Sequence, residues 1–204
     1  MRFSPRGRLA LTIVLAVYGF RMLTHPEVGW FLDNVDLPIH ETGHLVFSPF
    51  GEFMQFAGGT LFQLLLPAVF VGYFFRQKDR HGASIALWWV AQNLWNVSVY
   101  VKDARALELP LVGGGEHDWA YLLGELNLLP RDQAIGHAIW LAGVVVYLIA
   151  IGLGVNATLG NGITVAAFTL VGAGALIMKD TTPLAVFAPS RTKPFPKTSD
   201  QIDL

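Results

Sequence analysis

The sequence of 204 residues contains no cysteine and few charged residues. Without cysteine, disulfide bonds and thiolate metal ligands are excluded, so any metal would be held by His, Asp or Glu. Charged residues make up 14% of the chain, against about 25% in ordinary soluble domains. The 14 basic and 15 acidic residues nearly cancel, which leaves no basic surface for nucleic acid. Hydrophobic residues make up 53% of the chain and the mean hydropathy is +0.47. The small charged fraction and the large hydrophobic fraction together exclude a soluble cytosolic enzyme, and the hydrophobic fraction also excludes a disordered chain.

Long stretches without Asp, Glu, Lys or Arg mark the candidate membrane spans, because an ionised side chain at mid-bilayer costs at least ~2.5 kcal/mol. These stretches are 53–75, 81–101 and 133–178, and residues 9–24 are apolar apart from Arg21. The longest one exceeds a single span and contains a cluster of Gly and Asn at 152–162, so it predicts two helices joined by a turn. The sequence therefore predicts an all-α polytopic integral membrane protein with five or six transmembrane helices.

The remaining segments are more polar. Residues 26–51 contain six ionisable side chains, too many for a lipid-facing helix, which predicts a short buried helix shielded by protein or water. Residues 102–132 form a polar loop long enough to fold back over a site. We expect one membrane-embedded domain over 1–189 and a disordered tail over 190–204. If the short helix is re-entrant, the basic residues near the N-terminus and those at 76–80 lie together on the cytoplasmic side.

The pentapeptide His40-Glu41-Thr42-Gly43-His44 is the most informative motif. Histidines four residues apart lie on one face of a helix and can bind one metal ion together. In zinc peptidases this spacing provides two imidazole ligands and a carboxylate that acts as general base. The composition predicts roughly 0.005 chance occurrences of this pattern in the chain. The alternative is a buried, hydrogen-bonded His pair with a structural Glu.

This pentapeptide on a membrane-embedded helix resembles the site-2 protease family of intramembrane zinc metalloproteases. The stretch Gly59-Thr60-Leu61-Phe62-Gln63 is similar to the family motif G-P-x-x-N, with Thr for Pro and Gln for Asn. Asn96 followed by Asp103-Ala104-Arg105 is similar to the family helix that ends in L-D-G, whose Asp is the third zinc ligand. Lys102 and Ala104 replace the usual Leu and Gly, and no Pro lies between Asn96 and Asp103. The resemblance covers residues 36–103.

A catalytic zinc site needs a third protein ligand that folds back onto the two histidines. Asp103, at the exit of the 81–101 span, is the first candidate, and the alternative is an interfacial Asp paired with Arg105 or Lys102. The next candidates are His117 and Asp118, which follow a run of three glycines. The alternative interpretation of these two residues is that they belong to a surface turn and do not bind a metal.

Three amides within the spans are candidates for contacts with the substrate or the transition state. Amides of this kind also join helices, at about 0.6 kcal/mol each. The three residues are Gln63, Asn93 and Asn96.

These features predict a membrane-embedded zinc metallopeptidase that hydrolyses a membrane-associated protein or peptide. A second hypothesis is a membrane protein that binds or transports a divalent cation, and a third is a catalytically inactive relative of the proteases. The expected partners are the bilayer and the substrate. The chain has no transit-like segment rich in Arg and Ser, which favours a bacterial inner membrane or a plasma membrane.

Overall fold

The computed structural model describes residues 5–110, 116–155, 158–159, 170–171, 176–177 and 180–187. The chain forms two compact units, Met1–Gly154 and Val155–Leu204. The domain that the sequence predicts, 1–189, extends across this division, and the predicted tail, 190–204, lies outside the described residues. Each unit is described by itself.

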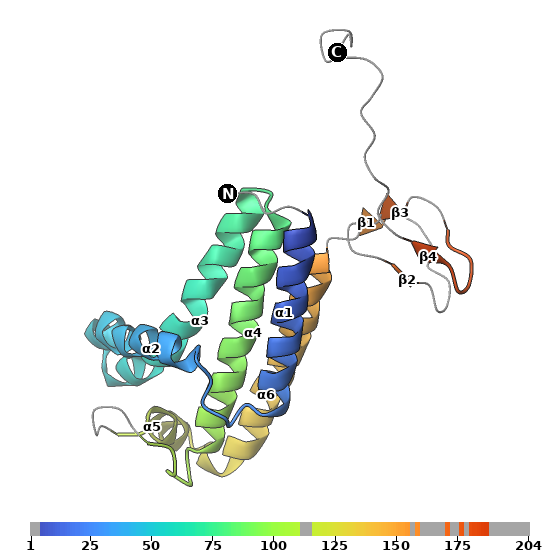
Figure 1. The fold of residues 1–204 in the computed structure, drawn as a ribbon. Coiled ribbons are helices and arrows are strands. Elements are labelled where there is room, and N and C mark those ends of the chain that lie inside the picture. Colours follow the sequence, from blue (N-terminus) through green and yellow to red (C-terminus); the bar gives the residue numbers. More distant parts are fainter. Residues whose placement is uncertain are drawn as a thin grey trace. The chain divides into compact units, whose positions relative to one another are not determined.

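The described part of the first unit is helical (Figure 1). The long helices run alongside one another, and a shorter helix, α2, lies beside the lower part of α3 (Figure 1). The elements in chain order are α1 (Pro5–Thr24), α2 (Asp33–Phe47), η1 (Ser48–Phe50), α3 (Glu52–Arg76), α4 (Arg80–Lys102), α5 (Asp118–Glu125), η3 (Leu129–Arg131) and α6 (Asp132–Val155). The predominantly helical fold predicted from the sequence is confirmed for this unit.

Three stretches in the described chain are long and apolar enough to cross a membrane. They are Gly7–Thr24, Glu52–Arg76 and Leu129–Gly154. The helix predicted at 81–101 is also present, as α4, and its 23 residues would reach about 34 Å. Its composition is too polar for it to join the other three. More of α4 is buried by protein than of its neighbours, so its surface depends less on lipid for burial.

The core of the first unit forms where α4 packs against α1 and α6. Trp88 and Trp95 of α4 cluster with Met22 of α1 and Tyr147 of α6. The Trp88 indole N–H donates to the carbonyl of Leu15 at 2.9 Å, and the Tyr147 hydroxyl donates to the carbonyl of Ala16 at 2.5 Å. These bonds satisfy polar groups that lipid would leave unpaired. The large aromatic side chains thereby fix the relative positions of three helices.

The short helix predicted within residues 26–51 is confirmed as α2, which carries the His40–His44 pentapeptide. It is 15 residues long, or about 22 Å, too short to cross the hydrocarbon core. α1 ends and α3 begins at the same end of the helical unit, so α2 does not carry the chain across (Figure 1). Protein covers α2 mainly on the side that packs against α3, so the expected shielding of its outer side by protein is not found there. Leu45, for example, is 75% exposed.

The described residues of the second unit form short parallel strand pairs. β1 (Thr158–Leu159) pairs with β3 (Leu176–Ile177), and β2 (Leu170–Val171) pairs with β4 (Val186–Phe187). The sequence predicts a helix in the second half of 133–178, and that prediction is wrong for the described strand residues. The stretch after Val155 is rich in Gly and in β-branched residues, which form helices poorly. The other residues of that predicted helix lie outside the described residues.

Candidate metal centre

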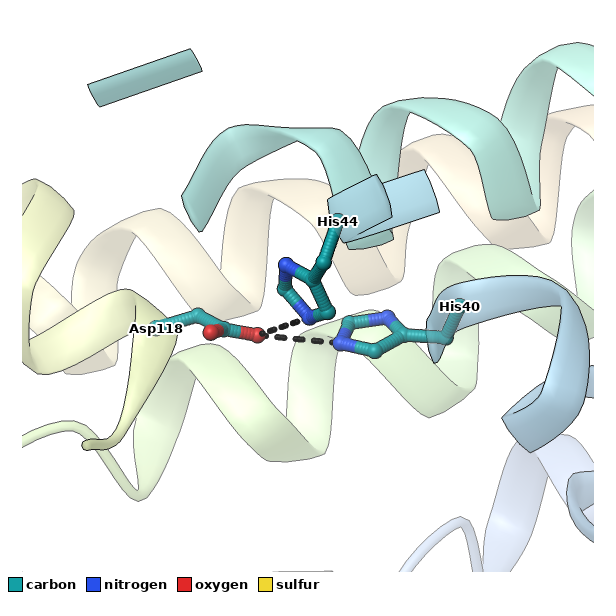
Figure 2. A group of neighbouring side chains, drawn as sticks. All are labelled: His40, His44 and Asp118. Carbon is teal, nitrogen blue, oxygen red and sulfur yellow. Dashed lines mark hydrogen bonds and ion pairs between the residues drawn. The ribbon is translucent and has the colours of Figure 1, made fainter. Parts of the chain in front are cut away.

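The two histidines of α2 and one carboxylate of α5 converge on a single point (Figure 2). Nε2 of His40 lies 2.9 Å from Oδ2 of Asp118, and Nε2 of His44 lies 3.4 Å from the same oxygen. One ligand atom from each of the three residues lies within 4.8 Å of the others. Two ligands of a tetrahedral zinc ion, each at about 2.0–2.1 Å, are separated by about 3.3 Å. The spacing of this group is therefore close to that of a metal site.

The N-terminal end of α5 places Asp118 opposite the histidines. His117 caps this helix, because its Nδ1 accepts a hydrogen bond from the backbone N–H of Ala120 at 3.2 Å. The backbone N–H of Asp118 donates to the hydroxyl of Tyr100 in α4 at 3.3 Å. Trp119 donates from its indole N–H to Oγ1 of Thr60 in α3 at 3.2 Å. α5 is thus tied to both α3 and α4 next to the candidate ligand.

The hydrogen bond of His44 determines which of its nitrogens carries the proton. Nδ1 lies 2.8 Å from the backbone carbonyl oxygen of Gln55. A carbonyl oxygen only accepts, so Nδ1 is the donor and Nε2 of the neutral ring presents a lone pair to Asp118.

His40 is oriented in the same way by a chain of side-chain hydrogen bonds. Asn96 donates to Oδ1 of Asp33 at 3.2 Å and accepts from Nε2 of Gln63 at 2.9 Å. This arrangement leaves Oε1 of Gln63 as an acceptor, 3.1 Å from Nδ1 of His40. Nδ1 of His40 is therefore the donor, and its Nε2 also presents a lone pair to Asp118.

The convergence of three electron-rich atoms requires positive charge between them. Protons can supply it: the hydrogen bond with Asp118 raises the pKa of His44 to about 9, although burial opposes the rise. Burial alone would raise the pKa of Asp118, but hydrogen bonds from His40 and His44 hold it below its usual value. A divalent metal ion is the other possible source of charge, and two imidazoles with one carboxylate are a donor set that zinc accepts. The residues therefore fit a metal ion.

Gly59 of α3 provides the space that the two imidazoles occupy. A Cβ atom at this position would lie 2.5 Å from Nε2 of His40 and 2.7 Å from Nε2 of His44. Any side chain here would displace the candidate ligands. The stretch 59–63, singled out from the sequence, thus lies directly against the histidines.

The candidate metal centre opens into a cavity of about 670 Å³. His40, His44 and Asp118 line it together with Glu41. Glu41 is exposed, and its charge helps to raise the pKa of His44, so its carboxylate lies within electrostatic reach of the group. A carboxylate that lines the same accessible cavity as the candidate ligands is a candidate general base.

Asp103, the first candidate for the third ligand, lies outside this group, and the next candidate, Asp118, is in it. The Asp103 carboxylate accepts hydrogen bonds from the backbone N–H groups of Glu108 and Leu109 at 2.9 and 3.1 Å, which closes the turn after α4. Its Oδ2 also lies 3.3 Å from Nε2 of His117. Burial lowers the pKa of His117, although the charge of Asp103 opposes the shift. Asp103 and His117 therefore shape the segment that returns Asp118 to the histidines.

Of the three amides predicted to contact a substrate, Gln63 and Asn96 line the cavity. Both are engaged in the hydrogen-bond chain that orients His40. Asn93 is fully buried and donates to the carbonyl of Trp89 at 3.0 Å and to Oδ1 of Asp36 at 3.4 Å. It is absent from the cavity lining. These amides thus connect helices and position a candidate ligand.

Asp33, whose carboxylate anchors the hydrogen-bond chain to His40, belongs to the site although the sequence motifs did not predict it. Oδ2 of Asp33 accepts from the backbone N–H of Trp30 at 2.7 Å, and Oδ1 accepts from Gln92 and Asn96. Burial raises the pKa of Asp33, and these hydrogen bonds oppose the rise. Asp33 precedes His40 by seven residues, two helical turns, so helical periodicity alone places it on the same face.

Comparison of the chain with protein-family models, with curated proteins and with solved structures gave no match. The resemblance to site-2 proteases therefore depends on the sequence motifs alone.

Proposed function

We propose that this chain is a polytopic membrane protein and a membrane-embedded zinc metallopeptidase. In this proposal α1, α3, α4 and α6 cross the bilayer, and α2 enters it without crossing. His40, His44 and Asp118 hold the zinc ion, and the substrate is a membrane-associated protein or peptide. The observation that carries the proposal is the convergence of Nε2 of His40 and Nε2 of His44 on Oδ2 of Asp118, in a cavity that Glu41 also lines.

The residues of the cavity have defined parts in this hydrolysis. A bound zinc ion would lower the pKa of water and polarise a carbonyl group. Glu41 accepts a proton from the water that adds to the carbonyl carbon. It returns this proton to the amide nitrogen as the C–N bond breaks. Gln63 and the carbonyl of Gln55 keep the two imidazoles turned with Nε2 toward Asp118.

Elemental mass spectrometry of detergent-purified protein tests the ligand set. We expect about one zinc ion per wild-type chain, loss of zinc in His44→Ala and Asp118→Asn, and retention in Asp103→Asn. Asp103→Asn is the matched control, because it replaces the same kind of carboxylate at a residue that lies outside the three candidate ligands. Zinc retained in Asp118→Asn would contradict the assignment of the third ligand. A wild-type chain that binds no zinc would leave the hypothesis of an inactive membrane protein.

Glu41→Gln separates a peptidase from a protein that binds or transports a cation. For a peptidase we expect this variant to retain zinc and to lose activity by about 10²- to 10⁴-fold, because it removes the general base. If the wild type instead moves zinc into vesicles and Glu41→Gln changes that uptake, cation transport is supported.

A further inference from the structure

The cavity at the candidate metal centre has a strongly one-sided charge. Among the described residues that line it, none is Lys or Arg. Five carboxylate side chains line it, namely Glu27, Asp33, Glu41, Glu116 and Asp118.

Two of these carboxylates are engaged by other residues of the chain. Asp118 faces the two histidines, and Asp33 accepts N–H groups from Trp30, Gln92 and Asn96. Glu27, Glu41 and Glu116 are exposed and make neither hydrogen bonds nor ion pairs with the described residues. Once Glu41 is assigned to proton transfer, the carboxylates of Glu27 and Glu116 still have no partner among the described residues.

Glu27 and Glu116 reach the cavity from separate segments. Glu27 lies in the connection between α1 and α2, and Glu116 lies just before α5. Arg105, a cation of the α4–α5 connection, is held by Asp132 at 2.6 Å and does not line the cavity. Clefts lined by one sign of charge concentrate ligands of the opposite sign.

We infer that Glu27 and Glu116 make the cavity selective for cationic peptides, with Lys or Arg within a few residues of the bond that is cut. This inference deepens the proposed function and rests on it. A Lys or Arg side chain can extend several ångströms from the reacting amide to an unpaired carboxylate, and Arg can bind one with two parallel hydrogen bonds.

Cleavage of a defined mixture of synthetic peptides by the zinc-loaded full chain tests the inference. Each Lys peptide is paired with one in which norleucine replaces Lys, and mass spectrometry measures the rate at each bond. We expect Lys peptides to be cut about tenfold faster, and this ratio to fall towards one in Glu27→Gln/Glu116→Gln. Glu125→Gln is the matched control, because Glu125 is exposed on α5 but does not line the cavity. Added salt should reduce the ratio in the wild type.

A binding measurement separates the failure of this inference from the failure of the proposed function. Fluorescently labelled copies of the Lys and norleucine peptides are mixed with increasing amounts of zinc-loaded Glu41→Gln, and the dissociation constant of each peptide is measured. Tighter binding of the Lys peptide that depends on Glu27 and Glu116 supports selectivity, even if the wild type cuts no peptide and the peptidase proposal fails. Equal binding and equal cleavage of both peptides would overturn the inference and leave the peptidase proposal intact.

Discussion

Gln63 determines which nitrogen of His40 faces the candidate metal centre. Its amide is 3% exposed and bonds to His40 on one side and Asn96 on the other. A ligating histidine usually donates its second N–H to a fixed acceptor, and loss of that acceptor costs about 10- to 100-fold in metal affinity. Gln63 accepts the N–H of His40 Nδ1, as the backbone carbonyl of Gln55 accepts the N–H of His44 Nδ1.

Gln63→Leu should therefore weaken zinc binding by about 10- to 100-fold, because Nδ1 of His40 loses its acceptor and the ring can turn. Competition with a zinc chelator of known affinity measures the change. Gln63→Glu is the matched variant: it keeps an acceptor oxygen for His40 and should retain zinc. Wild-type affinity in Gln63→Leu would show that Gln63 only joins helices.

The four-residue spacing in the sequence predicted that His40 and His44 lie together, but the candidates for the third ligand were ranked by chain order. Helical geometry is local, so a four-residue spacing suffices to place His40 and His44 together. The position of Asp118 depends on contacts distant in sequence, such as those of Trp119 with Thr60 and of the Asp118 N–H with Tyr100. Spacing along one chain contains no direct information about such contacts.

At the scale of elements, α2 and α3 are in close backbone contact where two glycines meet. A Cβ atom on Gly43 would overlap the backbone carbonyl of Gly58, and one on Gly58 would lie 2.5 Å from the carbonyl of Gly43. These neighbouring atoms are backbone and cannot turn away. Small residues at such a crossing let helix backbones approach in a membrane. The crossing also brings Gly59 against the two histidines.

Gly43→Ala should destabilise the protein by about 1–3 kcal/mol, because the added methyl group forces α2 away from α3. Thermal unfolding in detergent measures the loss as a lower midpoint. Gly72→Ala, on the exposed side of α3 with open space around it, should instead be neutral or stabilise by up to about 1 kcal/mol. If both substitutions have the same small effect, the close crossing is not a determinant of stability.

The long helices of the first unit followed from the gaps between charges. The prediction of a polar loop over 102–132 is wrong where α5 forms within it, and the last predicted helix did not hold where it is described. Long apolar runs determine α1, α3 and α6 because few other structures can bury them. α4 was found by the same gap, although its amides pair with other helices. After Val155 the apolar pattern suits strands as well as a helix, and hydropathy does not distinguish the two.

For the helical unit as a whole, the two ends differ in charge. Arg76 ends α3, Lys78 lies in the connection and Arg80 begins α4, and this connection lies at the end of the unit opposite α5 (Figure 1). Cytoplasmic connections of membrane proteins are enriched in Lys and Arg. This asymmetry predicts that the α3–α4 connection is cytoplasmic and that the cavity opens to the other side of the membrane.

Single cysteines can test this orientation cleanly, because the chain contains none of its own. Gln77, at the end of α3, and Glu125, at the end of α5, are both exposed. A membrane-impermeant maleimide added to intact spheroplasts should label Glu125→Cys and spare Gln77→Cys, and permeabilised membranes should allow both to react. Labelling of both from outside, or of Gln77→Cys alone, would contradict the orientation. Reaction of Glu125→Cys alone would place α5, which carries Asp118, on the extracytoplasmic side of the membrane.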